Sequence, residues 1–581
     1  MTLITLGISG STGHDAAAAI FIDGELVAAV EEERLMRRRH AEGFLPYQAV
    51  RQCLLQAQVK PTDIDIVAIP YAPVSLFNKA RWHYAYRHWY ALDRSLDVLF
   101  NGNRRYRRHI RELNTFLESL HIPLSKLKIV PVQHQLAHAS SSYHLSGSEG
   151  KTAILGLDTK GEYATIFLGY GEAGKIHRIK EFYDPDSLSG MYAAISDYLG
   201  FDILDGEFKV MGIAPLGDAT KYDFSYLAKF SKGKFKIDNQ LIGTVGFRRY
   251  KAKSRGHYFS QKLLDRLGPR REGNLTDEPY VHYAAAIQKC FEDYAIELVR
   301  YYLSDVLKDT GTLAIAGTSS LNIRLNQRLA ELPEVKRLIV HPGCGDSGTA
   351  IGAAAYAVHK RKQKISALES VFLGPSYSTE QCIYACENHR EKSRWEKLDN
   401  APLKAAQLLA DGELLAWFQG KMEFGPRALG NRSILANPAK QEVVDLLNKQ
   451  LKFRESWRSF SPSVLDSFAG EFLEGPWDYY MCSSVKVAAK WREKYASVVY
   501  ADGCTRAQVV SAKSNPRFHQ LLKHFETISG HSLVVNTTLC RPGEALICSP
   551  EDAMNMFHGS DLKYLIMEDV LISKTEEVDS W

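Results

Sequence analysis

Residues 131–162, PVQHQLAHASSSYHLSGSEGKTAILGLDTKGE, combine two signals that decide the fold of the first half of the chain. His134 and His138 stand four residues apart, so on a helix both rings project from one face and can hold one metal ion. The apolar run 153–157 then predicts a buried strand that ends on Asp158. The segment predicts a helix and a strand that meet at a metal site. The alternative interpretation is a chance pair of surface histidines.

The pattern around this strand occurs twice. Residues 152–182 predict strand, glycine turn, strand, turn and strand, and residues 3–30 predict the same order. Each turn can surround a phosphate with backbone N–H groups. Two such units indicate an α/β, two-lobed nucleotide-binding fold of the actin and hexokinase kind.

A third segment adds ligand-binding candidates. Residues 311–317 predict a buried strand, and a Gly-Thr-Ser-Ser turn from Gly317 leads to a helix that begins at Leu321 and includes Asn322. The strand 337–340 is followed by Asp346, a natural fourth ligand beside the two histidines and Asp158. Two imidazoles and two carboxylates suit iron, manganese or zinc. An alanine-rich helix is predicted at 349–358, and the polar run after it, HKRKQKISALES, is the expected domain boundary.

Two further segments are polar. Residues 206–217 predict a glycine-punctuated loop in which Lys209 suits a phosphate or carboxylate contact, and Gly161 lies in the turn after Asp158. The charged run 31–40, EEERLMRRRH, predicts the start of a helix and is typical of a solvated face.

The last third of the chain is rich in cations at the ends of predicted elements. Together with amide and hydroxyl donors on the strand 533–538, they predict an anion pocket for a phosphorylated small molecule. Ordinary surface cations are the alternative. The candidate residues are Arg427, Arg432, Lys452, Arg454, Arg458, Arg506, Asn536 and Thr538.

Residues 75–115 interleave aromatic and basic side chains, which is typical of nucleic-acid binding or of helices that cover a substrate cleft. Simple amphipathic packing is equally compatible. Because the 581-residue chain has a net charge of only +5, no bulk electrostatic force favours nucleic acid. Residues 232–275 are basic and turn-rich, and they predict a peripheral insertion.

Composition limits the class of protein. The length predicts at least two domains, and 45% hydrophobic residues are typical of a globular protein. Nine dispersed cysteines indicate reduced thiols in the cytoplasm. The absence of a signal sequence or a long apolar run predicts a protein that is neither secreted nor membrane-spanning, with small-molecule substrates and no nucleic-acid or membrane partner. A homodimer is the default expectation.

Taken together, the motifs resemble the ATP-dependent O-carbamoyltransferases of the NodU/CmcH type, which act in nodulation-factor, cephalosporin and aminoglycoside pathways. The matching stretches, in order, include HDAAAAIFIDGELVAAVEEER, HQLAHAS, LDTKGE, GEFKVMGIAPLGD, HPGCGDSGTAIGAA, FGPRALGNRSILANP, KFRESWRSFSPSV, ADGCTRAQ and VVNTTLCRPGEALICSPEDA. The resemblance implies an actin-like, duplicated (ASKHA) domain at 1–365, which binds metal and nucleotide. It also implies a YrdC-like α/β domain at 366–581, which binds carbamoyl phosphate.

The resemblance also implies a two-site reaction. Carbamoyl phosphate loses phosphate in the C-terminal domain, and the carbamate passes inside the protein to the N-terminal site. There ATP, with Mg²⁺, converts it to carbamoyladenylate, and a hydroxyl of a sugar or other natural product takes the carbamoyl group. The implied metal ligands are His134, His138, Asp158 and Asp346. Carbamoyl phosphate would contact Arg427, Lys452, Arg506, Asn536 and Thr538, and His14 would take the proton of the attacking hydroxyl.

This sequence departs from the family pattern at some positions. Arg39 stands where members commonly carry lysine, so a catalytic role there is limited to orienting an anion. The nucleotide loop is Gly-Thr-Ser-Ser in place of Gly-Gly-Val-Ala. Two other functions stay open at the level of sequence: a tRNA threonylcarbamoyl-type modification enzyme, and a non-catalytic nucleotide-binding regulator.

Overall fold

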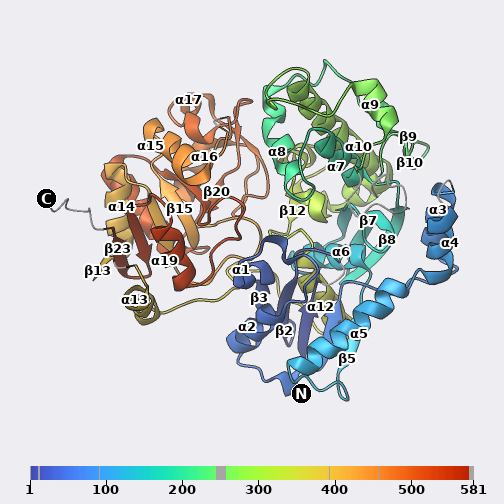
Figure 1. Ribbon diagram of the computed structural model, residues 1–581, viewed down its shortest axis with the longest axis horizontal. Coiled ribbons are helices and arrows are strands. Elements are labelled where there is room, and N and C mark those ends of the chain that lie inside the picture. The colour runs from blue at the N-terminus through green and yellow to red at the C-terminus, as the bar shows by residue number, and fades with distance from the viewer. Residues whose placement is uncertain are drawn as a thin grey trace. The chain divides into compact units, whose positions relative to one another are not determined.

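The computed structural model describes residues 2–10, 13–89, 92–243, 257–391, 393–455 and 457–574. The chain divides into two compact units, each a mixture of helices and sheet (Figure 1). Unit 1 comprises residues 1–27, 43–50 and 57–368, and unit 2 comprises 28–42, 51–56 and 369–581. The predicted α/β class is confirmed.

Two five-stranded sheets with the same strand order organise unit 1. The first has the order β3-β2-β1-β4-β5 and the second the order β8-β7-β6-β11-β12. In each, the first strand in sequence pairs antiparallel with the second, and two later strands run parallel to it. The strands are β1 (Ile4–Ile8), β2 (Ala17–Ile22), β3 (Glu25–Glu31), β4 (Ile66–Ile69), β5 (Lys128–Pro131), β6 (Thr152–Leu157), β7 (Ala164–Glu172), β8 (Lys175–Tyr183), β11 (Thr312–Ala316) and β12 (Arg337–Val340). Both predicted strand–turn–strand–turn–strand segments are therefore confirmed.

Two helices lie between these sheets. α12 (Gly348–Lys360) packs on β1, β2 and β4, whereas α6 (His134–His144) packs on β6, β7 and β11, and the two helices contact each other. They approach closely at Gly352, where an added Cβ would lie 1.9 Å from the carbonyl oxygen of Ala137. The helices α7 (Leu188–Tyr198) and α10 (Tyr280–Thr310) also pack against the second sheet. The second sheet is therefore covered by helices whose apolar faces it buries.

Shorter elements surround this centre. Residues 206–213 form the helix α8, so the predicted loop at 206–217 is wrong over most of its length. The apolar residues Val210, Met211 and Ile213 are buried and favour the helix over a loop. The other elements are α2 (Tyr47–Ala57), α3 (Lys79–Arg87), α4 (Leu92–Asn101), α5 (Arg104–Ser119), β9 (Ala228–Ser231), β10 (Lys234–Ile237), α9 (Gln261–Leu267) and α11 (Ile323–Ala330). Residues 244–256 of the predicted insertion lie outside the described residues.

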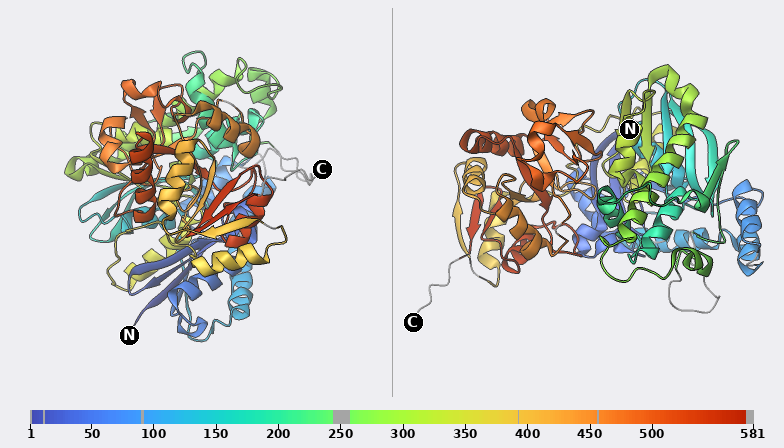
Figure 2. Two further views of the ribbon diagram at one scale, coloured as in Figure 1. Left: turned by 90° about the vertical axis from the view of Figure 1, so that its left-hand side faces the viewer. Right: turned by 90° about the horizontal axis from the view of Figure 1, so that it is seen from above.

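An eight-stranded mixed sheet with the order β13-β23-β22-β14-β15-β21-β16-β20 organises unit 2 (Figures 1 and 2). Alternate residues of β14 face its two sides, because Leu415 and Trp417 pack with α14 (Ala401–Asp411) and α18 (Pro516–Ser529). Ala416 and Phe418 pack with α13 (Thr379–Asn388) and α19 (Pro550–His558). The strands are β13 (Arg394–Lys397), β14 (Leu415–Phe418), β15 (Arg432–Ala436), β16 (Ser461–Leu465), β20 (Gln508–Val510), β21 (Leu533–Thr538), β22 (Tyr564–Met567) and β23 (Val570–Ser573).

The structure assigns the charged run 31–40 to unit 2. The environment of its side chains differs from the predicted solvated face. Its helix α1 (Glu32–Met36) is short, and Glu31, Glu32 and Arg34 are buried. Arg34 donates to the carboxylate of Glu31 and to the carbonyl of Gly425, so the charges are satisfied inside the unit. The predicted solvated face is therefore wrong for these residues.

Candidate active site

Three elements of unit 1 bring four donor side chains together. Asp158 follows β6, and Asp346 lies between β12 and α12, so both carboxylates stand at the carboxyl ends of parallel strands. His134 and His138 project from the first turns of α6, as their spacing predicted. One donor atom from each of the four lies within 4.8 Å of the others.

The distances among these atoms fit a common metal ion. His134 Nε2 lies 3.2 Å from an oxygen of Asp158 and 3.1 Å from His138 Nε2, and both rings lie 3.5 Å from an oxygen of Asp346. Two ligands that each bind a metal at about 2.1 Å are about 3.0 to 3.4 Å apart. The set therefore fits a divalent ion of the iron, manganese or zinc type.

The pKa values of the cluster indicate that its carboxylates favour positive charge beside them. Burial by itself lowers the pKa of His134, but the charges of Asp346 and Asp158 raise it well above 6.5. Burial likewise raises the pKa of Asp346, but His14 and His134 hold it well below 3.8. Two carboxylates therefore stay ionised in a buried place, where a cation stabilises them.

His14 extends the cluster from the turn between β1 and β2. Its Nδ1 lies 2.8 Å from the carboxylate of Asp15 and its Nε2 lies 3.7 Å from Asp346. Burial lowers the pKa of His14, and the carboxylates of Asp346 and Asp15 raise it to about 9. Glu162, half-buried in the turn between β6 and β7, accepts from the backbone N–H of His134 and fixes the start of α6.

Gly161 and Gly317 sit close to the cluster. A Cβ on Gly161 would lie 3.0 Å from the Cβ of His134, and one on Gly317 would lie 2.2 Å from the carbonyl oxygen of Leu157. With a φ of 89°, Gly317 lets the turn after β11 reach the end of β6. Thr318, the next residue, has its hydroxyl 3.4 Å from Asp346. Both glycines therefore allow close packing of the chain beside the donors.

Two other predicted nucleotide contacts are engaged elsewhere. Asn322 caps α11 through the backbone N–H of Leu325, and its amide exchanges hydrogen bonds with Gln288. Lys209 is half-buried on α8, with its ammonium 5.3 Å from the ring centre of Phe201. Contacts of these residues with a nucleotide stay predictions.

A second cluster, in unit 2, consists of cations. Burial and, to a smaller extent, mutual repulsion lower the pKa of Lys452, Arg454 and Arg458. The pKa of Arg454 falls to about 9. Arg506 contributes to this repulsion and donates to the hydroxyl of Ser461 at 2.9 Å. Within the described chain, Nη2 of Arg454 is buried without a hydrogen-bond partner. The arrangement is that of an anion site.

Lys452 connects this cluster to strand β21. Its ammonium donates to the carbonyl oxygens of Thr538, at 2.5 Å, and Cys540, at 3.0 Å. Asn536, on the same strand, donates to Ser463 and Gln508. The structure thus brings together Lys452, Arg506 and the end of β21. It also places Arg454 and Arg458, two further cations predicted for the anion pocket, near Lys452 and Arg506.

The two remaining candidates lie in other segments of unit 2. Arg427 is half-buried in the turn between β14 and β15, and Arg39 is exposed in a short 3₁₀ helix, Arg39–Ala41. Arg432, singled out beside Arg427, is fully buried and donates to the carbonyl oxygens of Gln419 and Pro375. Its hydrogen bonds serve the fold of the turn.

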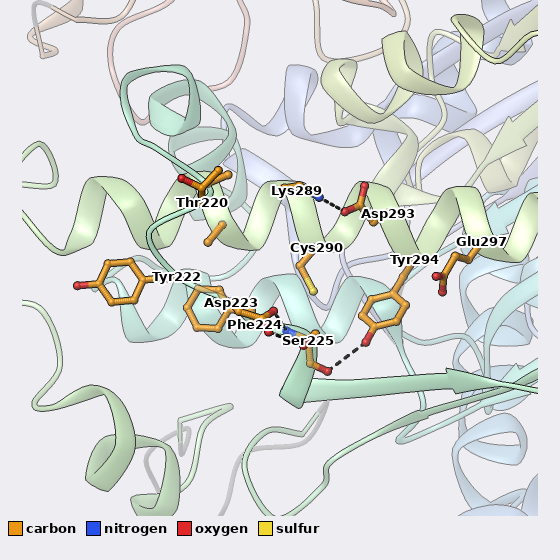
Figure 3. A pocket seen from close by; sticks show the side chains of 12 residues that line it. Thr220, Tyr222, Asp223, Phe224, Ser225, Lys289, Cys290, Asp293, Tyr294 and Glu297 are labelled. Atoms are coloured by element: carbon orange, nitrogen blue, oxygen red, sulfur yellow. Dashed lines mark hydrogen bonds and ion pairs between the residues drawn. The ribbon is translucent and has the colours of Figure 1, made fainter.

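A cavity of about 340 Å³ lies in unit 1 along α10 and contains none of these residues (Figure 3). Figure 3 shows Cys290 and Tyr294 of α10 opposite the segment Tyr222–Ser225. Two of its three carboxylates are engaged, because Asp223 accepts from Ser225 and Asp293 pairs with Lys289. This cavity is separate from both clusters.

Comparison with known proteins identifies the class. Residues 4–355 match the family "Carbamoyltransferase N-terminus", and residues 406–574 match "Carbamoyltransferase C-terminus". The nodulation protein NolNO of Sinorhizobium fredii is 31% identical, over 99% of this chain and 82% of its own. Nodulation protein U of Rhizobium tropici is 35% identical, over 90% and 89%. A solved structure of HypF in its phosphate- and nucleotide-bound form is 13% identical with a TM-score of 0.33, over 62% of this chain and 46% of its own, a likeness too loose to define the fold.

The chain belongs to the carbamoyltransferase family. It is accordingly an enzyme that transfers a carbamoyl group, in agreement with the resemblance of its motifs.

Proposed function

We propose that the protein is an O-carbamoyltransferase that uses carbamoyl phosphate and ATP to carbamoylate a hydroxyl of a sugar or other natural product. The observation that carries this proposal is the His134–His138–Asp158–Asp346 cluster in a chain of the carbamoyltransferase family. The cation cluster of unit 2 supports a separate site for the phosphorylated donor. The matching order of the two sheets in unit 1 supports an actin-like, duplicated architecture, which we propose for residues 1–365, with a YrdC-like domain at 366–581.

The cation cluster of unit 2 would carry out the first step, the release of phosphate from carbamoyl phosphate. Lys452, Arg454 and Arg506 would hold the phosphate group of carbamoyl phosphate, and water would release phosphate and leave carbamate. Thr538 and Asn536 would orient the carbamoyl end. Arg427 and Arg39 are proposed as further anion contacts.

The second step belongs to unit 1. A carbamate oxygen attacks the α-phosphorus of ATP, pyrophosphate leaves and carbamoyladenylate forms. The acceptor hydroxyl then attacks the carbamoyl carbon, and AMP leaves. A divalent ion held by the four donors would supply positive charge for the phosphate oxygens. His14 lies beside the cluster and would take the proton of the hydroxyl in its neutral form, which a metal ion on Asp346 would favour by offsetting the negative charge that raises the pKa of His14. Gly161, Gly317, Asn322 and Lys209 are proposed nucleotide contacts.

The test is product analysis with ATP, carbamoyl phosphate and Fe²⁺ or Mn²⁺, without acceptor. We expect AMP, pyrophosphate and phosphate from the wild type. The variant His138→Gln should lose AMP formation by at least about a hundredfold, because an ion needs its full ligand set, while it still releases phosphate. His144→Gln changes a half-buried histidine on the same helix, is the matched control and should retain both. Consumption of neither substrate under any metal would refute the proposal.

A further inference from the structure

The helical hairpin α3–α4 exposes a group of large apolar side chains. Eight of the 21 large hydrophobic side chains that are exposed in the described chain fall within residues 76–100, which argues against random exposure. Phe77 is 85% exposed, Tyr86 74% and Phe100 77%. We call this set the hairpin surface: Leu76, Phe77, Trp82, Tyr86, Trp89, Leu92, Leu96 and Phe100.

The spacing of these residues gives each helix an apolar stripe. Trp82 and Tyr86 on α3 are four residues apart, and Leu92, Leu96 and Phe100 repeat at the same interval on α4. The opposite faces are anchored: Ala80 and Tyr84 are buried, and Ser95 donates to the carbonyls of Ala85 and His88. The two stripes therefore lie on the outer side of folded helices. Figure 1 and the right panel of Figure 2 show the hairpin at the margin of unit 1, beyond β8.

Positive charge is concentrated beside these stripes. Residues 77–112 contain nine Lys and Arg against three Asp and Glu, a net charge of +6, which exceeds the +5 of the whole chain. Helix α5 starts four residues after Phe100 with the exposed arginines 104, 105, 107, 108 and 111. Arg108 pairs with Glu112, and among the described residues the other four have no carboxylate within salt-bridge distance. The surface around the hairpin therefore favours an anionic partner.

We infer that the hairpin surface and the first turns of α5 dock the protein on an anionic lipid bilayer. Apolar helix stripes bordered by arginines are the chemistry of a helix that lies at the boundary between headgroups and acyl chains. None of the described helices combines the length and apolarity needed to cross a bilayer, so the contact is peripheral. A second copy of the chain is disfavoured because the exposed arginines of two such surfaces would repel each other. Trp82, Tyr86 and Phe100 offer rings for base stacking, so RNA is the alternative partner that the test below must exclude.

The test is sedimentation of the full chain with vesicles of equal parts phosphatidylglycerol and phosphatidylcholine, compared with phosphatidylcholine alone. We expect binding to the anionic vesicles only, weakened by salt. Leu96→Ser with Phe100→Ser should reduce partitioning at least about tenfold. Arg104→Gln with Arg105→Gln and Arg107→Gln should reduce it roughly a hundredfold, since each cation near an anionic surface contributes about 1 kcal/mol. Leu55→Ser with Tyr384→Ser, which are similarly exposed on α2 and α13, is the control and should bind as the wild type does.

Because all substituted side chains are exposed, the thermal unfolding of each variant should match that of the wild type, which separates lost docking from lost folding. The inference is overturned if the wild type ignores anionic vesicles at low salt, or if the apolar variant binds them unchanged. It is also overturned if the protein binds single-stranded RNA but not the vesicles, and these variants abolish the binding of RNA. A concentration-dependent dimer that the variants dissociate in the absence of lipid would assign the surface to a second copy.

Discussion

At the scale of residues, the two clusters carry opposite charge requirements. The donors of unit 1 keep two carboxylates ionised in a buried place, and the cations of unit 2 repel one another in a buried place. The ionised carboxylates are stabilised by the histidines beside them, so a metal ion would supply a positive charge that the site already favours. For the cations, burial removes the water that would stabilise the charge, and mutual repulsion adds to this cost. The first cluster therefore calls for a cation and the second for an anion.

The cost of the cation cluster leads to a test with Arg454. The variant Arg454→Met keeps much of the apolar stem and removes one repelled charge, so we expect the ligand-free protein to be stabilised by about 1 to 4 kcal/mol. The same variant should lose the rise in melting temperature that inorganic phosphate gives the wild type. Thermal unfolding with and without phosphate measures both effects. Lys440→Met, whose ammonium donates to the carbonyl of Asp411 on the surface, is the control. A variant that is destabilised and still responds to phosphate would contradict the anion site.

Much of the metal cluster could be predicted from the sequence, because the helical spacing of His134 and His138 and the strand ends at Asp158 and Asp346 are local signals. Arg454 and Arg458 could be named as candidates for the anion pocket, but their nearness to Arg506 could not be predicted, since it depends on contacts far apart in the chain. Burial of Glu31 and Arg34 could not be predicted either, because Gly425, which satisfies Arg34, lies almost 400 residues away.

At the scale of elements, α6 and α12 determine where the histidines stand. Their approach depends on Gly352, where a Cβ would meet the backbone of Ala137 at 1.9 Å. Backbone cannot yield as a flexible side chain does, so Gly352→Ala should displace α6 and cost about 3 kcal/mol or more. We expect a lower melting temperature and weaker retention of metal, measured by elemental analysis. Gly470→Ala on α16 (Asp466–Phe472) has open space around its Cβ and should be neutral or slightly stabilising. Equal losses in the two variants would show that the contact with Ala137 is not responsible.

Helix α6 ends at His144, a histidine that makes the stability of the protein depend on pH. Burial lowers the pKa of His144 to about 4, and its ring bonds to Ser140 and to the carbonyl of Gly174. Below about pH 6.5 the unfolded chain binds a proton that the folded one does not bind until about pH 4, so this residue lowers stability as the pH falls across that range. At pH 5 this difference in pKa lowers the free energy of unfolding by about 2 kcal/mol.

The variant His144→Gln should therefore lose less stability than the wild type between pH 7 and pH 5. Unfolding at the two pH values gives the comparison, with each variant referred to its own value at pH 7. An unchanged difference would mean that His144 is protonated in the folded protein.

Element types were the most predictable level of the structure. The strands β1 to β3, β6 to β8, β11 and β21 and the helices α6 and α12 follow the predicted segments, because apolar periodicity and glycine turns are strong local signals. The helix α8 was missed, since the glycines at 206, 212 and 217 suggested a loop whereas buried contacts stabilise the helix. The expectation of no membrane partner rests on the absence of a long apolar run, a signal for membrane-spanning helices that does not report a peripheral contact such as the one inferred for the hairpin.

At the scale of the whole molecule, one chain carries both family segments, the first spanning residues 4–355 and the second 406–574. Carbamate is short-lived in water, so a chain that makes and consumes it gains by keeping it from solution. Under the proposed function, two proteins that each lack one step should therefore not complement each other efficiently.

Mixing experiments test this directly. Lys452→Met should block release of phosphate from carbamoyl phosphate, and His138→Gln should block formation of AMP. Equal amounts of the two variants, mixed, should form AMP at a small fraction of the wild-type rate, since carbamate would have to cross the solution. Ammonium carbamate added in excess should restore AMP formation to Lys452→Met and not to His138→Gln, which shows that each variant lacks only its own step. Full activity of the mixture would mean that carbamate moves freely between molecules and that its protection is not the reason for joining the two steps in one chain.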